Sequence, residues 1–459
     1  MSTTLTQHLY GTDASKSTQR TALTTGEIPV AVYGLGKMGL PLASVYGEVT
    51  GNVVGADIDP SVVATINDGN CHIKREPELA SIVSELVSDG SLEATVEPRD
   101  AAANASIHVV IVPTPITDTN APDLSILDAV IEDIATGLQA GDFVIIECTV
   151  PPQTTEHRVR RALESNSGLN IGDFGLAFCP ERTSSGRALE DIRGAYPKVV
   201  GGVDKESTRV GTLIYEEIND RGVIPVSDAT TAEAVKVFEG LYRDVNIALA
   251  NELATLTDEM GVDVNEAIDV ANTQPFCDIH DPGPGVGGHC IPFYPYFVIN
   301  PFSTETPLLE MARSVNDSMP AFTVGKIREE FVAEGESLEG SSVLVLGLTY
   351  RPGVEEIRAS PSIMIAEELS SSGADVYGVD PMLDTATEFD LQLIELEDVY
   401  DRSWDAIISV TPHDEFESIR WESIERADGQ LVVIDGRGTV DVGDADHRVY
   451  TIGSGRRPK

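Results

Sequence analysis

Basic residues are scarce in this chain. Its 459 residues include 31 Lys and Arg against 75 Asp and Glu, which gives a formal net charge of −44. Nucleic acids and anionic membrane surfaces are bound through basic patches, so this balance argues against both partners. The acidic residues are spread along the chain, an excess typical of proteins from salt-loving microbes, where salt screens the self-repulsion. We therefore expect a solvated acidic surface and weaker folding at low salt.

Cysteines are few, and no two of the five form a C-x-x-C pair. The sequence therefore favours neither a zinc site nor a disulfide framework, and it predicts no metal and a reducing, cytoplasmic location. No apolar run approaches the length that spans a membrane. Residues 1–27 are rich in Thr and Ser and lack the apolar core of a signal peptide, so we expect a mobile N-terminal extension there.

A glycine-rich turn lies between an apolar run and a helical pattern in residues 28–49. A second apolar run follows and ends at an acidic residue, eighteen positions after the last glycine of the turn. This order predicts a dinucleotide fold, in which the glycines let a pyrophosphate approach a helix N-terminus and the acid accepts hydrogen bonds from the ribose. A carboxylate there repels a 2′-phosphate, which favours NAD over NADP. The predicted cofactor contacts are Gly34, Gly36, Lys37, Met38, Gly39 and Asp57.

Three further apolar runs, at 106–115, 142–152 and 174–182, each end in a polar or Pro-rich turn. Ligands of open parallel sheets bind at the carboxyl ends of the strands, so these turns are expected to line one crevice. For each threonine alone, a capping or turn role is a competitive interpretation. The side chains placed at the crevice are Thr114, Thr149, Glu181 and Arg182.

A long helical pattern covers residues 229 to about 260. Lys236, Gly240 and Arg243 fall at i, i+4 and i+7 and share one face. By spacing alone, the two cations fit equally well as site residues or as surface charges whose stems cover apolar neighbours. A second α/β segment begins near residue 320, with apolar runs at 341–352, 374–381, 405–416 and 431–438. It lacks the glycine triplet, so we expect it to hold a nucleotide without being a second NAD site.

Eight motifs in order then give the chain a family resemblance. They are Gly34-x-Gly36-x-x-Gly39-Leu40-Pro41, PTP at 113, TVPP at 149, CPER at 179, AEAVK at 232, GPGVGGHC at 283, LGLTYRP at 346 and EEIRASP at 355. With them the chain resembles the UDP-glucose/GDP-mannose dehydrogenase family over nearly its whole length. YRDVNIALANE at 242–252 and GGHC at 287–290 resemble the branch that acts on UDP-N-acetylmannosamine more than the UDP-glucose branch.

The resemblance implies an α/β fold of two doubly wound Rossmann-like domains, joined by a long central helix and a helical dimerisation region. The expected division is the extension 1–27, an NAD-binding domain 28–228, a central region 229–318 with the cysteine loop, and a UDP-sugar-binding domain 319–459. It also implies a homodimer or higher homo-oligomer.

The resemblance further implies an NAD-dependent four-electron oxidation of a UDP-sugar C6 alcohol to a carboxylate, through a cysteine thiohemiacetal and thioester. The catalytic residues carried over are Cys290, Lys236, Thr149 and Glu181. Thr114, Thr149 and Arg358 join the NAD contacts, and Arg358 is expected to reach NAD from the C-terminal domain. The residues expected at the sugar nucleotide are Glu181, Arg182, Lys236, Arg243, Gly287, Tyr350 and Arg351.

A free cysteine is most often a buried, inert thiol, and we keep that interpretation for Cys71, Cys148, Cys179 and Cys277. The GGHC context reverses it for Cys290. His289 beside it is expected to pack or to contact substrate, because neighbours on an extended segment point apart.

Three departures from the family pattern stand near the predicted site. Gly240 occupies the position of an asparagine, Tyr294 that of an aspartate, and Gln274-Pro275-Phe276 that of His-Pro-Arg. Losing one oxyanion donor costs about a hundredfold in rate, so the departures bear on activity. The alternatives are a UDP-glucose 6-dehydrogenase, a nucleotide-sugar-binding protein with weak or no turnover, and, less favoured, a two-electron hydroxyacid dehydrogenase that would need no Cys290.

Overall fold

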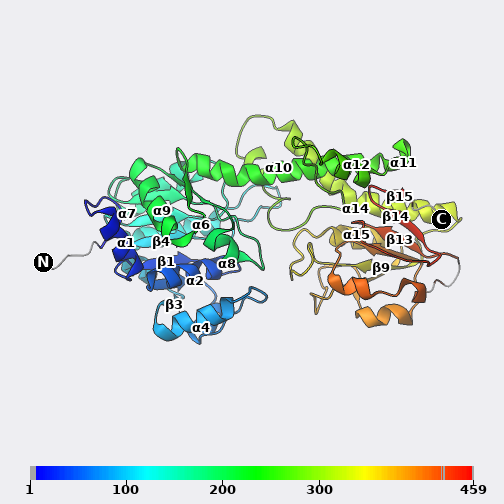
Figure 1. The fold of residues 1–459 in the computed structure, drawn as a ribbon, viewed down its shortest axis with the longest axis horizontal. Coiled ribbons are helices and arrows are strands. Elements are labelled where there is room, and N and C mark those ends of the chain that lie inside the picture. The colour runs from blue at the N-terminus through cyan, green and yellow to red at the C-terminus, as the bar shows by residue number, and fades with distance from the viewer. Residues whose placement is uncertain (1–6, 425, 427–428, 457–459) are drawn as a thin grey trace. The chain divides into compact units, whose positions relative to one another are not determined.

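The computed structural model describes residues 7–424, 426 and 429–456 and divides into two compact units. The first unit comprises Met1–Glu239 with Tyr296–Phe302, and the second comprises Gly240–Pro295 with Ser303–Lys459. Each unit is built around one sheet (Figure 1). The division into four segments at 27/28, 228/229 and 318/319 stays a prediction.

The first unit contains an eight-stranded sheet in the order β3-β2-β1-β4-β5-β6-β7-β8. Its strands are parallel except for the antiparallel pair of β6 and β7, and the first six follow the order of a doubly wound dinucleotide fold. The strands are β1 (Val30–Tyr33), β2 (Val53–Ala56), β3 (Leu92–Thr95), β4 (Ile107–Val110), β5 (Phe143–Ile146), β6 (Gly175–Phe178), β7 (Lys198–Gly202) and β8 (Val223–Pro225).

The helices of the first unit connect its strands as the crossovers that parallel neighbours need, except α1, which precedes β1, and α13, which follows β8. They are α1 (Lys16–Thr24), α2 (Gly39–Thr50), α3 (Pro60–Asn67), α4 (Leu79–Asp89), α5 (Pro98–Asn104), α6 (Ser125–Gly137), η1 (Thr155–Val159), α7 (Arg160–Ser167), α8 (Ala188–Glu190), η2 (Asp191–Ala195), α9 (Lys205–Ile218) and α13 (Tyr296–Ile299).

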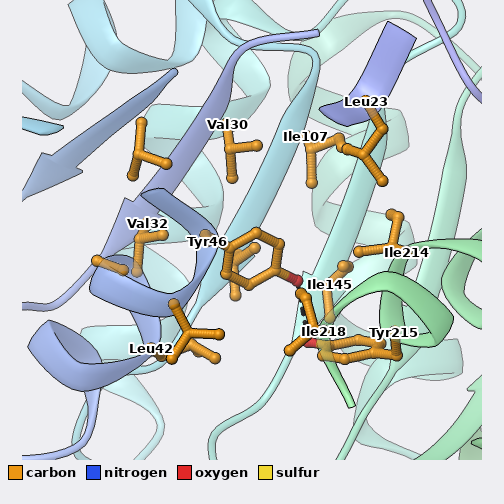
Figure 2. Close-up of a cluster of buried hydrophobic side chains, with 14 of the residues drawn as sticks. Leu23, Val30, Val32, Leu42, Tyr46, Ile107, Ile145, Ile214, Tyr215 and Ile218 are labelled. Atoms are coloured by element: carbon orange, nitrogen blue, oxygen red, sulfur yellow. Dashed lines mark hydrogen bonds between the residues drawn. The ribbon is translucent and has the colours of Figure 1, made fainter. Parts of the chain in front are cut away.

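The strands β1, β5 and β6 are buried on both faces of this sheet, and they are apolar without interruption. In β1, Val30 and Val32 join one hydrophobic cluster, while Ala31 and Tyr33 join the cluster on the opposite face. Figure 2 shows the first of these clusters, where Tyr46 of α2 donates a hydrogen bond of 3.1 Å to the hydroxyl of Tyr215 on α9. The sheet is therefore a rigid base for the loops at its carboxyl edge.

The expectation of a mobile extension over 1–27 does not hold for residues 7–27. The side chain of Ser15 caps α1, and Ala22 and Leu23 of that helix are fully buried in the core. Lys16 forms an ion pair of 2.7 Å with Glu216 on α9. The Thr- and Ser-rich composition concealed a short amphipathic helix, and residues 1–6 lie outside the described part of the chain.

The expected long helix is present as α10 (Ala229–Thr255), which begins in the first unit and ends in the second. In the second unit, buried polar groups join α10 to α14: Asn251 donates to Asn316 (2.9 Å), and Asn316 donates to the Asp244 carboxylate (2.8 Å). The helices that follow α10 are α11 (Thr257–Met260), α12 (Val264–Ala271), α14 (Pro307–Ala333) and α15 (Pro361–Ser371). The part of the chain that the structure describes has no helix long and apolar enough to cross a membrane.

The second unit holds a seven-stranded sheet in the order β11-β10-β9-β12-β13-β14-β15, which repeats the strand order of the first. Only the pair of β14 and β15 is antiparallel. The elements are β9 (Ser342–Leu346), β10 (Asp375–Val379), β11 (Gln392–Leu393), η3 (Leu396–Asp401), β12 (Ala406–Ser409), η4 (Asp414–Ser418), η5 (Trp421–Ser423), β13 (Val432–Asp435), β14 (Arg448–Thr451) and β15 (Gly455–Arg456). The fold is thus α/β with two doubly wound sheets, as predicted.

Candidate active site

The glycine-rich turn packs too tightly for side chains at two of its three glycines. A Cβ at Gly39 would lie 2.8 Å from the carbonyl carbon of Gly34, and one at Gly34 would lie 2.6 Å from the oxygen of Ile111. A Cβ at Gly36 would meet no atom within 4 Å, so the backbone there is open to a ligand. The turn at the start of α2 therefore fits a pyrophosphate.

Asp57 lies directly after β2, at the edge of the sheet where this turn begins. Its Oδ2 accepts a hydrogen bond from the N–H of Leu35 (2.8 Å), and its Oδ1 accepts one from the N–H of Asp59 (3.0 Å). These bonds fix the carboxylate beside the turn, and an ionised carboxylate there suits ribose hydroxyls. The open backbone at Gly36 and the carboxylate of Asp57 therefore fit NAD.

The strand-end turns that the sequence predicted to converge do lie together. Thr114, after β4, donates through its hydroxyl to the backbone oxygen of Thr149, after β5 (2.6 Å). The hydroxyl of Thr183, in the turn after β6, donates to the sulfur of Met38 in the glycine-rich turn (2.9 Å). Loops that follow four strands thus contact one another in pairs, and their shared crevice stays a prediction.

Lys236 on α10 contacts this crevice through Glu181. Its Nζ lies 3.5 Å from Glu181 Oε2 and donates to the backbone oxygen of the same residue, and the two side chains are 8% and 18% exposed. Burial acts to raise the pKa of Glu181, but Lys236 and hydrogen bonds from Thr183 hold it below its ordinary value. Glu181 is therefore an ionised, half-buried carboxylate paired with a lysine.

Arg182 turns away from Glu181. It forms an ion pair of 2.7 Å with Glu239 on α10, and its guanidinium lies 4.8 Å from the centre of the Tyr196 ring. Its predicted role at the sugar nucleotide stays a prediction.

Cys290 lies in the second unit on an exposed turn. The glycines before it pack directly on the segment after β9: a Cβ at Gly287 would lie 2.7 Å from the oxygen of Ala359, and one at Gly288 would lie 2.8 Å from the ring of Tyr350. The N–H of Gly288 also donates to the oxygen of Arg358 (2.9 Å). The glycines therefore allow a close approach that presents the thiol beside Tyr350.

His289 bonds to the same segment. Arg358 Nη1 lies 2.9 Å from His289 Nδ1, and His289 Nε2 lies 2.6 Å from Glu356 Oε2. A guanidinium can only donate, so Nδ1 accepts and the proton is on Nε2, which donates to the carboxylate. His289 thus packs against residues 356–358 and holds the cysteine turn in place.

Tyr350 is surrounded by the predicted substrate residues of the second unit. Burial raises its pKa, Arg351 and Arg243 act to lower it, and the nearby groups of Cys290 and Glu356 act to raise it. The charges of Arg351 and Arg243 thus act on Tyr350, and a shared substrate site of these residues with Cys290 stays a prediction.

In the second sheet, Asp380 holds the position that Asp57 holds in the first, directly after the strand that pairs with the first strand of its sheet. Asp380, after β10, accepts hydrogen bonds from the N–H groups of Leu348 and Thr349 (both 2.7 Å). It also accepts from the Thr349 hydroxyl and lies 3.1 Å from His413 Nε2. These bonds fix the turn after β9, and the absence of a second NAD site stays a prediction.

Four further residues of the first unit are charged or polar groups that the sequence interpretation did not select. Glu147 directly follows β5 and precedes Thr149 by two positions, and this place at a strand end could have identified it from the sequence. Nothing in the sequence marked its partners. These residues are Glu147, Lys198, Tyr215 and Glu233.

The remaining cysteines differ from Cys290. Cys148 and Cys179 are fully buried, and burial raises the pKa of Cys148 to about 12 and that of Cys179 as well. Such thiols are poor nucleophiles. Within the described residues no group of three or more His, Cys, Asp or Glu side chains is arranged to hold a metal ion.

Comparison with known proteins agrees with this geometry. Three domains described for the UDP-glucose/GDP-mannose dehydrogenase family match the chain: the NAD binding domain over residues 28–219, the central domain over 230–318 and the UDP binding domain over 344–442.

Individual relatives cover most of the chain. The UDP-N-acetyl-D-mannosamine dehydrogenase of Pyrococcus horikoshii is 38% identical over 90% of this chain and 96% of its own. A solved structure of UDP-D-ManNAc dehydrogenase from Pyrococcus horikoshii superposes with a TM-score of 0.85 at 36% identity, over 93% of this chain and 100% of that one. A UDP-glucose dehydrogenase from Pyrobaculum islandicum gives a TM-score of 0.82 at 27% identity, over 92% and 96%. The chain therefore belongs to the UDP-glucose/GDP-mannose dehydrogenase family and is an NAD-dependent UDP-sugar 6-dehydrogenase.

Proposed function

We propose that this enzyme oxidises UDP-N-acetylmannosamine to UDP-N-acetylmannosaminuronate. The choice of sugar is supported by the name of the Pyrococcus horikoshii relative and by the motifs around Arg243 and Cys290. The observation that carries the chemistry is Cys290: it is exposed on a turn packed against Tyr350, whereas the other four cysteines are buried or half-buried.

The balanced reaction converts one alcohol, two NAD⁺ and one water into a carboxylate, two NADH and three protons. Bound NAD⁺ supplies the acceptor for each of the two hydrides. Between the two oxidations the Cys290 thiolate adds to the aldehyde carbon, and the thiohemiacetal becomes a thioester when the second hydride leaves. Water then hydrolyses the thioester and frees the thiol. This covalent route divides one difficult step into easier ones.

Lys236 and Glu181 stabilise the charge that develops in this scheme. The ammonium of Lys236 stabilises the oxygen that gains negative charge, and Glu181 orients it through the ion pair. Thr149, whose backbone oxygen is bonded by Thr114, is assigned a catalytic role at the same sheet edge. Each role is assigned from motif position and from the contacts within the first unit.

Substrate binding is assigned to Glu181, Arg182, Lys236, Arg243, Gly287, Tyr350 and Arg351. Arginine suits this task because a planar guanidinium pairs with two phosphate oxygens. Arg358 is assigned to NAD, and its hydrogen bond to His289 gives it a second, structural partner.

We also assign a homodimer. Large apolar side chains are exposed along α10 and directly after it in the second unit, among them Tyr242 (52%), Leu249 (49%) and Leu256 (39%), and such patches are typical of interfaces. Five free cysteines suit a reducing cytoplasm. Mass measurement by light scattering during gel filtration tests the dimer, and a monomer at micromolar concentration would contradict it.

A panel of UDP-sugars with NAD tests the proposed function. UDP-N-acetylmannosamine should give two NADH per sugar and a mass gain that corresponds to carboxylate formation. UDP-glucose should react with a kcat/KM at least tenfold lower. Faster oxidation of UDP-glucose would identify the other branch of the family. Binding of UDP-sugar without NADH formation would identify a nucleotide-sugar-binding protein.

A further inference from the structure

A second buried ion pair lies next to Glu181 in the first unit. Lys198 Nζ, at the start of β7, lies 2.6 Å from Oε2 of Glu147, and the two side chains are 13% and 1% exposed. A buried ion pair loses much of its attraction to desolvation and is a weak source of folding stability. Stability alone therefore gives no reason for two opposite charges at this depth.

The pair is connected to Glu181 through the backbone and through a shared cavity. The N–H of Glu181 donates to the backbone oxygen of Glu147 (3.3 Å). Glu147, Glu181 and Lys198 line one cavity with about 20 Å³ of space for the centre of a water molecule. That volume accommodates about one water, so the carboxylates of Glu147 and Glu181 share an environment.

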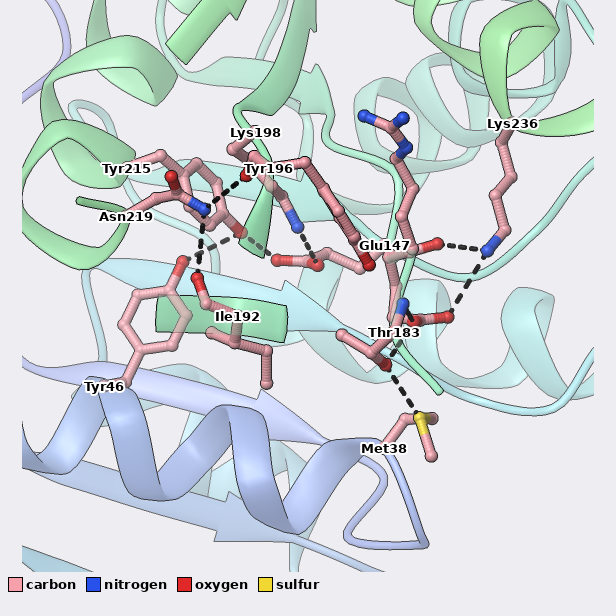
Figure 3. A network of polar contacts seen from close by, with 12 residues as sticks. Met38, Tyr46, Glu147, Thr183, Ile192, Tyr196, Lys198, Tyr215, Asn219 and Lys236 are labelled. Atoms are coloured by element: carbon pink, nitrogen blue, oxygen red, sulfur yellow. Dashed lines mark hydrogen bonds and ion pairs between the residues drawn. The ribbon is translucent and has the colours of Figure 1, made fainter. Parts of the chain in front are cut away.

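Aromatic hydroxyls hold Glu147 from the other side (Figure 3). Tyr215 donates to Glu147 Oε1 and accepts from the hydroxyl of Tyr46 (3.1 Å). Lys198 Nζ lies 4.6 Å from the centre of the Tyr215 ring, within reach of a cation–π contact. With partners on both oxygens, the Glu147 carboxylate has one position.

The two ion pairs act on each other. Lys198 is one of the charges that lower the pKa of Glu181, and Lys236 is one of those that oppose the effect of burial on Glu147. Burial raises the pKa of Glu147, and the neighbouring Glu181 carboxylate raises it further. Two carboxylates and two lysines thus form one group in which each charge faces opposite charges.

We propose that Glu147 and Lys198 are positioning residues that hold Glu181 in place and set its charge during oxidation of the sugar. The inference rests on the function proposed above, in which Glu181 is needed as a carboxylate beside Lys236. The positive charge of Lys198 favours the ionised form of Glu181. Glu147 anchors Lys198 through the ion pair, and its negative charge partly offsets the effect of Lys198 on Glu181.

Titratable and charged groups face Glu181 from several elements. They are Glu147 after β5, Arg182 in its own turn, Asp191 in η2, Tyr196 just before β7, Lys198 at the start of β7, and Lys236 on α10. Of the three cations, Lys236 is assigned to catalysis and Arg182 to substrate binding, which leaves Lys198 without an assigned role.

The pH dependence of kcat/KM in Lys198 and Glu147 variants tests the proposal. Lys198→Met removes a cation near Glu181, so the acid limb of the kcat/KM profile, where activity falls with decreasing pH, should move to higher pH. At a pH on that limb, kcat/KM should fall about three- to tenfold. Lys198→Arg keeps the charge and should restore the limb. Glu147→Gln removes a like charge, so the limb should move to lower pH. A structural role alone would lower activity without these opposite shifts.

A matched control uses an ion pair on the surface of the same unit. Arg158 Nε lies 2.7 Å from Asp128 Oδ1, and the arginine side chain is 52% exposed. Arg158→Met should leave the acid limb unchanged. Near-ultraviolet circular dichroism and NADH binding verify that each variant is folded, and if Lys198→Met does not fold, the pair Lys198→Arg and Glu147→Gln decides.

Infrared titration of the Glu181 carboxyl provides a readout that needs no turnover. The difference between wild type and Glu181→Gln isolates its band, and the same difference taken in the Lys198→Met background should titrate at higher pH. If wild type oxidises no UDP-sugar, the proposed function fails and the infrared titration still decides the inference. Unchanged titration of Glu181 in Lys198→Met, with an unchanged acid limb in an active enzyme, would overturn the positioning role alone.

Discussion

The ring of Tyr294 occupies the space that a side chain at Gly240 would fill. A Cβ built at Gly240 would lie 2.8 Å from Tyr294 Cγ and 3.0 Å from its Cβ, and it would overlap the ring. The backbone N–H of Tyr294 donates to the oxygen of Cys290 (2.9 Å), so the ring anchors the cysteine turn on α10. Two departures from the family pattern, glycine for asparagine and tyrosine for aspartate, are therefore one packing arrangement.

Gly240→Ala should destabilise the second unit by about 1–3 kcal/mol, because the ring is rigid and the site is full. Gly240→Ala combined with Tyr294→Ala should show a coupling free energy of about 1 kcal/mol or more in a double-mutant cycle. Urea denaturation measures both, and the rate of Cys290 alkylation reports movement of its turn.

Gly325→Ala on α14 is the control, since a Cβ there meets no atom within 4 Å. It should stabilise by about 0.5–1 kcal/mol, the usual gain for Gly→Ala inside a helix. Equal effects at positions 240 and 325 would contradict the packing arrangement.

Glu233 fixes the loop that carries Thr149. Its carboxylate, on α10, accepts the N–H groups of Gln153 (2.6 Å) and Thr155 (2.7 Å), and burial raises its pKa to about 7. Because the folded pKa is above the ordinary value, the folded state binds this proton more tightly. The contribution to stability is greatest below about pH 4.5, falls as the pH rises to about 7 and is constant above.

Glu233→Gln should remove about 2–3 kcal/mol of this pH dependence. The change appears in the difference between wild-type and variant melting at pH 5 and pH 8, which cancels the other titrating groups. Glu85→Gln, at an exposed position on α4, serves as the control. A Glu233→Gln variant with the pH dependence of wild type would show that the carboxyl does not titrate in this range.

Asp57 should determine the choice of cofactor. Asp57→Asn keeps an oxygen for the N–H of Leu35 but removes the charge that repels a 2′-phosphate. The ratio of NADPH to NADH dissociation constants should fall at least tenfold, as measured by fluorescence titration. Asp59→Asn, which keeps the cap of α3, should leave the ratio unchanged. An unaltered ratio in Asp57→Asn would remove Asp57 from the ribose site.

The acid excess predicts a dependence on salt. With a net charge of −44, self-repulsion opposes folding and is screened as ionic strength rises. The melting temperature should rise by several degrees between about 0.1 M and about 2 M KCl. Sucrose of equal osmolality should give a smaller rise, since it does not screen charge. Full stability at low ionic strength would contradict a salt-adapted surface.

The elements that the sequence predicted well are those that local patterns determine. The glycine-rich turn, β1, α2 and β2 follow from two apolar runs, one glycine triplet and one acid. The helix expected over 229 to about 260 is α10, which ends at Thr255 and is followed by α11. The convergence of Thr114 and Thr149 followed from the edge that parallel strands share.

Other elements depend on contacts between distant residues. The antiparallel entry of β7 beside β6 and the burial of α1 come from tertiary packing, which local composition does not encode. The same limit applies to the pair Glu147–Lys198, whose members are fifty-one positions apart and meet only when β5 and β7 are assembled. For His289 the sequence left packing and substrate contact open. The structure shows packing, because the imidazole bonds to Glu356 and Arg358.

Covalent attachment of the sugar to Cys290 tests the account most directly. Wild-type enzyme mixed with NAD and limiting UDP-N-acetylmannosamine, then quenched in acid within milliseconds, should yield a Cys290 peptide that carries the sugar nucleotide as thioester. Cys290→Ala should bind NADH normally and make no acid, whereas Cys277→Ala should behave as wild type. An unmodified Cys290 peptide throughout turnover, together with acid formation by Cys290→Ala, would contradict the mechanism.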